Sequence, residues 1–410
     1  MKAKAACKGE TVRNAGDMHN PGAATGLSLL IPITLSTMAI VLLAPVLPQM
    51  LVEYRDVPGH EYLVPMILTT PALCVAFLSP VAGMLGDYFG RRRLLIAALG
   101  TYAIVGLAPI FLQGLGAIIA SRVLVGVAEA LIMVLTTTMI GDYFTGARRD
   151  KWLAAQTAVA SISALIFFNL GGFLGSFGWR TPFWAYLSAL VMLAAVVRFT
   201  WEVTPVGDAK PPHNASWAGF PWARMAGIIA ITIFASILFY TVQIQASPGL
   251  AALGLTDPSR IGFLTSVASL GVPLGTFLYA RLAGTRVSSL LTAEFAILGV
   301  GFLLMSRATG TTGFLIGCAI NQLGAGLLLP TLLVWAMSQL HFEVRGRGTG
   351  LWNGAFALGQ WLSPIVVAFS AARMGGLLPA FGILAIASLT ALAATVLGGF
   401  IFFRPRPAHG

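Results

Sequence analysis

A short charged turn lies between two long apolar stretches in the first quarter of the chain. Residues 83–94 read Gly-Met-Leu-Gly-Asp-Tyr-Phe-Gly-Arg-Arg-Arg-Leu, and uncharged sequences run into this turn from both sides, at 62–84 and 94–112. Each flank is close to the roughly 20 apolar residues that an α-helix needs to cross a bilayer. The turn is therefore predicted to join two membrane-spanning helices at one membrane surface.

The composition extends this interpretation to the whole chain. Of its 410 residues, 57% are hydrophobic and 10% are charged, whereas a soluble domain carries about 25% charged residues. Most of the apolar surface must therefore face lipid, and the chain is predicted to be an all-α membrane protein of about twelve spans. The spans are expected at 27–50, 62–84, 94–112, 115–140, 152–175, 180–201, 222–245, 258–281, 287–306, 311–338, 348–373 and 376–402.

The positive charges are distributed unequally between the two ends of these spans. If the spans alternate in direction, 19 of the 25 Lys and Arg residues fall on one side and 5 on the other, and Arg122 alone lies within a span. Cytoplasmic loops carry an excess of Lys and Arg, so the basic side and both chain ends are predicted to be cytoplasmic. The net charge of +11 does not indicate a nucleic-acid partner, because the charges form no basic domain.

A polar stretch divides the chain into halves that echo one another. Phe144 and Phe342 occupy matching positions in the two halves, and within the first half residues 86–89 and 141–144 share the sequence Gly-Asp-Tyr-Phe. Parallel six-span repeats are a known transporter plan. The expected divisions are a cytoplasmic tail 1–26, a six-helix bundle 27–201, a cytoplasmic linker 202–221, a second six-helix bundle 222–403 and a cytoplasmic tail 404–410.

Three ionisable residues lie within spans: Arg122, Glu129 and Glu294. Such residues are costly in a membrane and normally face a cavity or a partner. Arg122 and Glu129 are seven residues apart and share one helix face. Because low dielectric favours the neutral form of a carboxylic acid, Glu129 is a candidate for proton coupling, with Arg122 beside it. The alternatives are a structural ion pair, or an Arg122 side chain that reaches the outer interface.

Glu294 has apolar helical neighbours in the ninth span. It is a further coupling candidate, although a buried hydrogen bond is the role we favour. The three cysteines are scattered and all five histidines fall in loops or tails. The sequence therefore predicts no metal site, no cofactor and no catalytic residues.

Three motifs resemble those of the major facilitator superfamily. Residues 83–94 are similar to its signature loop between spans two and three, with Tyr88 where the family usually has arginine. Residues 122–126 are similar to its arginine–glycine motif in span four. Residues 169–175 contain the glycines, though not the proline, of the fifth span in drug–proton antiporters. The chain thus resembles the bacterial twelve-span branch of these antiporters, which implies two pseudo-symmetric six-helix bundles.

The resemblance assigns a role to the turn. In the family, the position of Asp87 faces the start of the eleventh span, here Gly348 to Gly350. A carboxylate at a helix N-terminus is stabilised by about 0.3–1 kcal/mol, so this contact is expected to act as a conformational latch. The alternative is that the charged turn only fixes topology. The latch residues are expected to be Gly83, Asp87, Gly90, Arg91, Arg92 and Arg93.

The resemblance also implies a substrate cavity lined by spans one, four, seven and ten. Polar side chains on these spans suit an amphipathic organic molecule, although hydrogen bonds between helices would explain them equally well. The expected lining residues are Thr34, Thr37, Glu129, Tyr240, Gln243, Asn321 and Trp335.

The function expected from these observations is secondary active transport by alternating access. We expect a monomer in the bacterial inner membrane, surrounded by lipid, that exports a drug-like or amphipathic small molecule in exchange for protons. Proton-coupled uptake of a nutrient or organic metabolite is the alternative. A channel would require charge rings or a repeated filter, and a membrane-embedded enzyme would require clustered His, Asp, Glu or Cys; the sequence indicates neither.

Overall fold

The protein is an all-helical bundle throughout the residues that its computed structural model describes, 21–202, 220–282, 284–340 and 345–398. In these ranges, twelve helical segments are long and apolar enough to cross a membrane. The predicted all-α fold with twelve spans is therefore confirmed. Of the predicted tails and linker, 1–20, 203–219 and 404–410 lie outside the described residues.

The first half contains six of the spans. Its first span begins at Ala23, before the predicted start, and is broken by two short 3-10 turns that contain Pro32 and Pro45. The elements are α1 (Ala23–Leu30), η1 (Ile31–Ile33), α2 (Thr34–Val41), η2 (Ala44–Val46), α3 (Leu47–Glu53), α4 (His60–Phe89), α5 (Arg91–Gly106), α6 (Ala108–Phe111), α7 (Leu115–Tyr143), α8 (Gly146–Gly175), η3 (Thr181–Leu187) and α9 (Ser188–Phe199).

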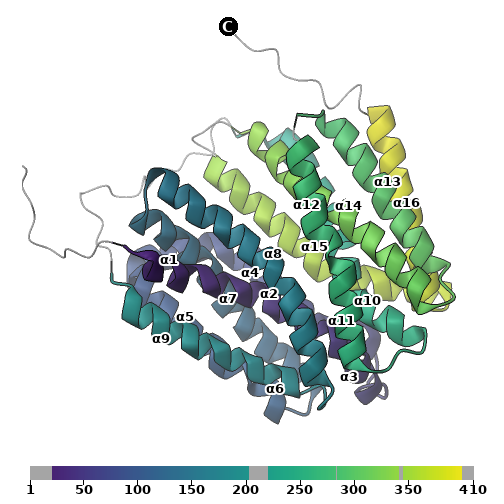
Figure 1. Ribbon diagram of the computed structural model, residues 1–410, viewed down its shortest axis with the longest axis horizontal. Helices are drawn as coiled ribbons and strands as arrows, with labels where there is room; N and C mark the ends of the chain where they lie inside the picture. The colour runs from purple at the N-terminus through teal and green to yellow at the C-terminus, as the bar shows by residue number, and fades with distance from the viewer. Residues whose placement is uncertain (1–20, 203–219, 283, 341–344, 399–410) are drawn as a thin grey trace, which may run out of the picture.

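The second half contains the other six spans. It begins at Trp222, and its second span is divided at Leu270 into two helices. The elements are α10 (Trp222–Ala252), α11 (Pro258–Ser269), α12 (Gly271–Leu282), α13 (Val287–Ser306), α14 (Thr311–Ser338), α15 (Arg345–Met374) and α16 (Leu377–Gly398). In Figure 1 the two halves, coloured purple to teal and green to yellow, lie beside one another.

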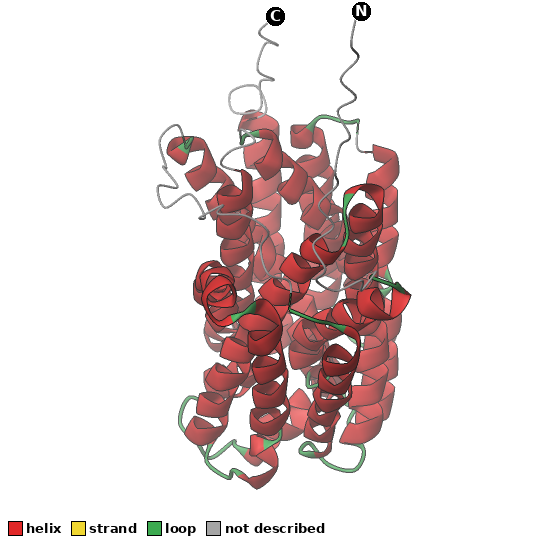
Figure 2. Ribbon diagram, turned by 90° about the vertical axis from the view of Figure 1, so that its left-hand side faces the viewer, coloured by secondary structure: helices red, strands yellow, loops and turns green. Residues whose placement is uncertain are grey.

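Short turns reverse the chain between successive spans, so the helices run between two ends of the bundle (Figure 2). One end carries residues 91–93, Arg148 and Arg149. We call this the arginine-rich end and the other the opposite end. α4, α7 and α14 finish at the arginine-rich end. α11 and α14 start at the opposite end.

The turn at residues 83–94 is shorter than the sequence suggests. α4 continues to Phe89 and α5 starts at Arg91, which leaves only Gly90 outside a helix. Gly90 has φ 88°, a left-handed conformation that glycine adopts at little steric cost. The two helices therefore run past the predicted span ends at 84 and 94, because a single glycine reverses the chain and the charged residues extend the helices.

Each half has its own apolar core, and the halves meet along two seams. At the first seam α8 packs against α11, where a Cβ on Gly172 would lie 2.5 Å from the Pro258 carbonyl oxygen and 3.0 Å from Gly262 Cα. Only glycine permits this approach. At the second seam α4 packs against α15, and small apolar side chains of α4, α7 and α15 form one cluster that includes Ala72, Val75, Ala130 and Ala357.

Candidate functional site

Glu129 lies on α7 beside the second seam. Its side chain is buried, and the neighbouring residue Ala130 belongs to the apolar cluster that joins α4, α7 and α15. Within the described residues, Glu129 Oε2 has no hydrogen-bond partner. An unpartnered carboxylate oxygen at membrane depth is costly unless a proton or a ligand satisfies it.

Side chains from both halves surround Glu129. Cys74 of α4 and Tyr240 of α10 lie within electrostatic range of its carboxylate. Tyr240 belongs to the second half but packs against the core of the first, and its ring lies 5.5 Å from that of Phe356 on α15. Ile244, one turn further along α10, is fully buried in the same first-half core. Glu129 therefore sits where relative movement of the halves would change its surroundings.

Arg122 also lies within electrostatic range of Glu129, but its hydrogen bonds are made with other residues. Its Nη1 donates to the Tyr186 hydroxyl at 3.0 Å, and its Nη2 donates to the carbonyl of Gly106 at 3.2 Å. The guanidinium also lies 5.2 Å and 5.1 Å from the ring centroids of Phe183 and Tyr186. Among the described residues it forms no ion pair with Glu129, and it is fully buried. Both predicted alternatives, an ion pair and a side chain reaching the interface, are therefore wrong.

The partners of Arg122 form a network that ties four elements of the first half together. Tyr186 of η3 stacks on Tyr102 of α5 with centroids 5.2 Å apart. The Tyr102 hydroxyl donates to the Leu35 carbonyl of α2 at 2.8 Å. Gly106 is required here, since a Cβ would lie 2.2 Å from the Tyr186 ring. The sequence did not indicate these tyrosines, because no spacing links 102 or 186 to 122.

Glu294 is fully buried inside the second half. The Thr331 hydroxyl of α14 donates to its Oε1 at 2.5 Å, while Oε2 has no partner among the described residues. α13, which carries Glu294, packs against α14 and α16 of the same half. The hydrogen bond that we favoured from the sequence is present, and the residue lies away from both seams.

The residues predicted to line one cavity are not all gathered at one place. Gln243 Nε2 donates to Gln322 Oε1 at 2.6 Å, which joins α10 to α14. Asn321 instead faces α13, where its Nδ2 donates to the Leu298 carbonyl at 3.3 Å. Trp335 packs against the core of the second half. The prediction from sequence therefore missed Gln322 as the partner of Gln243 and selected the neighbouring residue, Asn321.

The two threonines of the first span also differ. Thr34 Oγ1 donates to the Ile31 carbonyl of its own turn at 2.8 Å. Thr37 Oγ1 reaches across to the Ala160 carbonyl of α8 at 3.5 Å. Thr37 is thus the one that links two spans.

The two Gly-Asp-Tyr-Phe sequences of the first half share one arginine. Asp87 Oδ1 accepts from Arg91 Nε at 3.1 Å and from Nη2 at 2.7 Å, and Arg91 Nη1 donates to Asp142 at 2.5 Å. Asp87 is thus held by α5 of its own half, and its side chain is 49% exposed. Among the residues that the structure describes, Asp87 has no hydrogen bond to Gly348–Gly350, the predicted contact near the start of α15.

The remaining residues of the predicted latch lie around this ion pair. Arg92 Nη2 donates to the Val197 carbonyl at the end of α9 at 2.8 Å. A Cβ on Gly83 would lie 3.8 Å from Val134 of α7, and Arg93 is exposed. These contacts connect α4, α5, α7 and α9 within the first half.

Fold and site together define a multi-pass membrane protein of two six-helix halves with a buried carboxylate at their seam. Within the described residues, no three His, Cys, Asp or Glu side chains gather closely enough to hold a metal ion. Residues 29–256 match the family model of the Major Facilitator Superfamily, and the chain belongs to this family. It is therefore a secondary transporter and not an enzyme.

Relatives and solved structures agree with this assignment. The chain is 27% identical to the class C tetracycline resistance protein of Escherichia coli, over 84% of this chain and 90% of that one. It is 30% identical to multidrug resistance protein 1 of Bacillus subtilis (strain 168), over 72% of this chain and 77% of that one. A bacterial homolog of the human lysosomal transporter Spinster, solved inward-facing and unoccupied, shares the fold with a TM-score of 0.74 at 16% identity, over 96% of this chain and 100% of that one.

Proposed function

We propose that this transporter exports an amphipathic small molecule in exchange for protons, and that Glu129 carries the proton. The observation that carries the proposal is the Glu129 carboxylate, buried at the seam with one oxygen unpartnered. Two similar proteins are named for resistance to tetracycline and to multiple drugs, which supports export of drug-like molecules.

The site offers a simple coupling scheme. Glu129 lies within electrostatic range of Tyr240 of the other half, and Tyr240 packs in an aromatic group with Phe239, Phe356 and Trp352. Aromatic faces suit the apolar part of an amphipathic substrate, and the carboxylate suits a proton or a polar group. Substrate binding at this aromatic group and protonation of Glu129 would compete. The halves would therefore rearrange with either the substrate or the proton bound.

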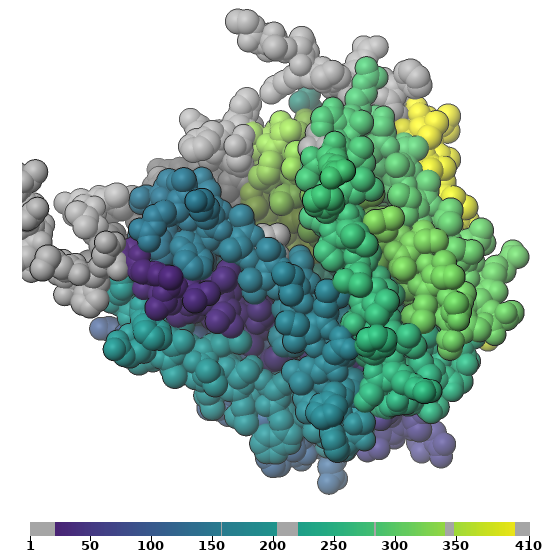
Figure 3. Space-filling view, in the orientation of Figure 1, coloured from purple at the N-terminus to yellow at the C-terminus, as the bar shows by residue number. Residues whose placement is uncertain are grey.

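Alternating access requires the seams to open at one end at a time. At the opposite end α8 and α11 are in close contact (Figure 3), and the Ser259 hydroxyl of α11 donates to the Gly172 carbonyl of α8 at 3.4 Å. At the arginine-rich end, Asp87 is half-exposed and bound within its own half. We therefore propose that this conformation opens at the arginine-rich end, and that this end is cytoplasmic because Lys and Arg are concentrated there.

We keep the latch as a proposal for the second conformation. When the arginine-rich end closes, Asp87 would leave Arg91 for the start of α15, where a carboxylate is favoured by the helix dipole. Asp87→Asn is expected to slow transport without reducing the amount of folded protein in the membrane. Full transport by that variant would refute the latch.

The function can be tested with the purified chain in proteoliposomes. A thermal-shift screen of antibiotics and organic metabolites first identifies a ligand, and its flux is then measured with imposed pH gradients of either sign. Exchange predicts uphill movement of the ligand against the direction of proton flow. Uphill movement with the protons would establish the alternative, proton-coupled uptake, and flux indifferent to the pH gradient would refute proton coupling.

A further inference from the structure

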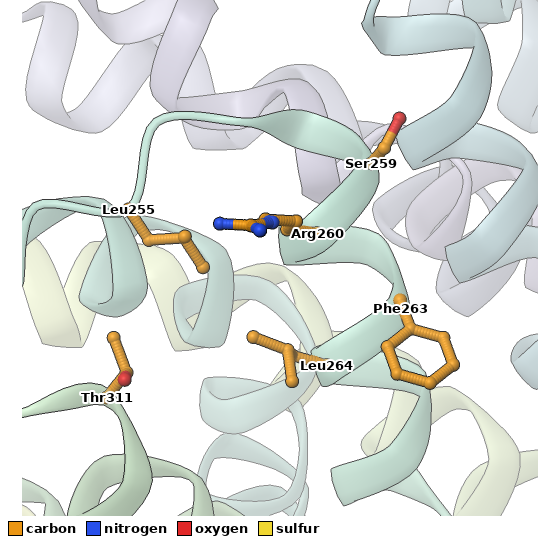
Figure 4. Close-up of a pocket in the computed structure, with 6 residues that line it drawn as sticks. All are labelled: Leu255, Ser259, Arg260, Phe263, Leu264 and Thr311. Carbon is orange, nitrogen blue, oxygen red and sulfur yellow. The ribbon is translucent and has the colours of Figure 1, made fainter.

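A cavity of about 500 Å³ lies at the opposite end of the second half, between the start of α11 and the start of α14. The cavity lies at the ends of helices, whereas Glu129 lies in the middle of α7. The transport scheme above does not use the cavity. Figure 4 shows the residues around it. They are Leu255, Ser259, Arg260, Phe263, Leu264 and Thr311.

The cavity has an apolar wall and a polar rim. The apolar wall consists of Leu255, Phe263 and Leu264. Phe263 is 57% exposed and belongs to the membrane-spanning segment Pro258–Leu282. Arg260 extends toward Leu255 across the space (Figure 4). A membrane-facing cavity with one cationic group at the level where a span begins matches the layout of a phospholipid, whose charged headgroup lies above its acyl chains.

Arg260 has no counter-ion in the described part of the chain. Arg180, at the same end, lies 3.5 Å from Glu53. The acid nearest to Arg260 in the sequence is Asp257, whose Oδ1 caps α11 by accepting from the Ser259 backbone N–H at 3.1 Å. In addition, a cation in the first turn of a helix lies at the positive end of its dipole. An external anion is the partner that would relieve this charge.

We propose that the cavity binds an anionic phospholipid from the membrane leaflet at the opposite end. The phosphodiester lies against the Arg260 guanidinium, with the Thr311 hydroxyl as a further donor. An acyl chain covers Phe263 and Leu264. Arginine recognises phosphate through its fork of N–H donors, and the apolar wall selects a lipid over a free phosphate ion.

Native mass spectrometry of the full chain tests the proposal by titration with phosphatidylglycerol and, separately, phosphatidylethanolamine of the same acyl chains. Arg260→Gln is expected to weaken phosphatidylglycerol binding about tenfold, the effect of losing one charge-assisted hydrogen bond, and to abolish the preference for the anionic lipid. Arg373→Gln is the matched control, since Arg373 lies in the last turn of α15 at the same end and is absent from the cavity. Equal lipid preference in the wild-type protein and Arg260→Gln would overturn the proposal.

Two further measurements separate a lipid from a small anion. Phe263→Ala is expected to weaken binding of both lipids by a similar factor, because it removes part of the apolar wall and leaves Arg260 in place. Glycerol 3-phosphate, which has the phosphate and no acyl chain, is expected to produce no thermal stabilisation at concentrations where phosphatidylglycerol does. If glycerol 3-phosphate binds as tightly as the lipid, the site is one for small anions and the lipid assignment is wrong.

Discussion

Glu129 and Glu294 are two buried carboxylates at membrane depth with different surroundings. Glu129 lies at a seam, near Tyr240 of the other half, and its Oε2 is unpartnered. Glu294 lies between two helices of one half and accepts a 2.5 Å hydrogen bond from Thr331. A group at a seam changes its surroundings when the halves move, whereas a group inside one half moves with it. We therefore propose that position relative to the seam, and not burial alone, distinguishes a coupling acid from a structural one.

The largest expected effect is the loss of coupling in Glu129→Gln. Glutamine keeps the size of the side chain but cannot take up or release a proton, so transport against a gradient should be abolished. Downhill exchange of the substrate between the two sides should persist, because the halves can still move. The measurement is uphill flux in proteoliposomes with an imposed pH gradient, beside substrate counterflow without one.

Glu294→Gln is the matched control for this experiment. The same chemical change inside one half should leave uphill flux close to that of the wild-type protein, because the amide oxygen can still accept from Thr331. The proposed difference between Glu129 and Glu294 would be refuted if Glu294→Gln abolished uphill flux, or if Glu129→Gln retained uphill flux with normal pH dependence.

Arg122→Gln is expected to reduce stability more than it alters coupling. The guanidinium donates to Tyr186 and to the Gly106 carbonyl in a fully buried position. Hydrogen bonds to a charged group contribute about 1.5–3 kcal/mol each, so we expect a loss of about 3 kcal/mol after partial replacement by the amide. The free energy of unfolding can be measured by denaturant titration in mixed micelles.

Tyr186→Phe tests whether Arg122 acts through this network. It removes one acceptor and should lower the unfolding free energy by about 1 kcal/mol, with the pH dependence of transport unchanged. A shifted pH profile in Tyr186→Phe would instead place Arg122 on the proton path, as the sequence first suggested.

The fold could be predicted from the sequence because its determinants are local. The length of an apolar stretch and the charge at its ends are enough to locate a span in lipid. The errors occurred where a local feature overrode this pattern. Gly90 allows a one-residue reversal, so α4 extends to Phe89, and Pro32 and Pro45 break the first span into shorter pieces.

The site could be predicted only in part because side-chain partners come from distant spans. Ionisable residues at membrane depth identified Arg122, Glu129 and Glu294, but nothing in the sequence places Tyr186 against Arg122. Neighbouring residues on a helix point about 100° apart, so the sequence could not decide whether Asn321 or Gln322 faces α10. The repeated Gly-Asp-Tyr-Phe was visible, yet its meaning, two aspartates on Arg91, required the structure.

Gly172→Ala tests the seam that closes the opposite end. The added methyl would meet the Pro258 carbonyl oxygen at 2.5 Å, and such overpacking costs about 1–3 kcal/mol. The closed end should become less populated, so a cysteine in place of Ser259, whose hydroxyl donates to the Gly172 carbonyl at 3.4 Å, should react faster with a membrane-impermeant maleimide. Gly227→Ala on α10 is the control, because nothing lies within 4 Å of its Cβ position. Equal labelling rates in the two variants would contradict the role assigned to this seam.

The smallest expected effect concerns the hydrogen bond inside the second half. Thr331→Val removes the donor to Glu294 and leaves both carboxyl oxygens without a partner, which should lower the unfolding free energy by about 1–2 kcal/mol. Adding Glu294→Leu should recover much of this loss, since replacing both partners of a buried polar pair by apolar groups is often neutral. Uphill flux should survive in the double variant, because its halves still move as units and Glu129 is intact. If the double variant remains folded but loses uphill flux, the acid inside the half is needed for coupling, and the distinction drawn between seam and interior does not hold.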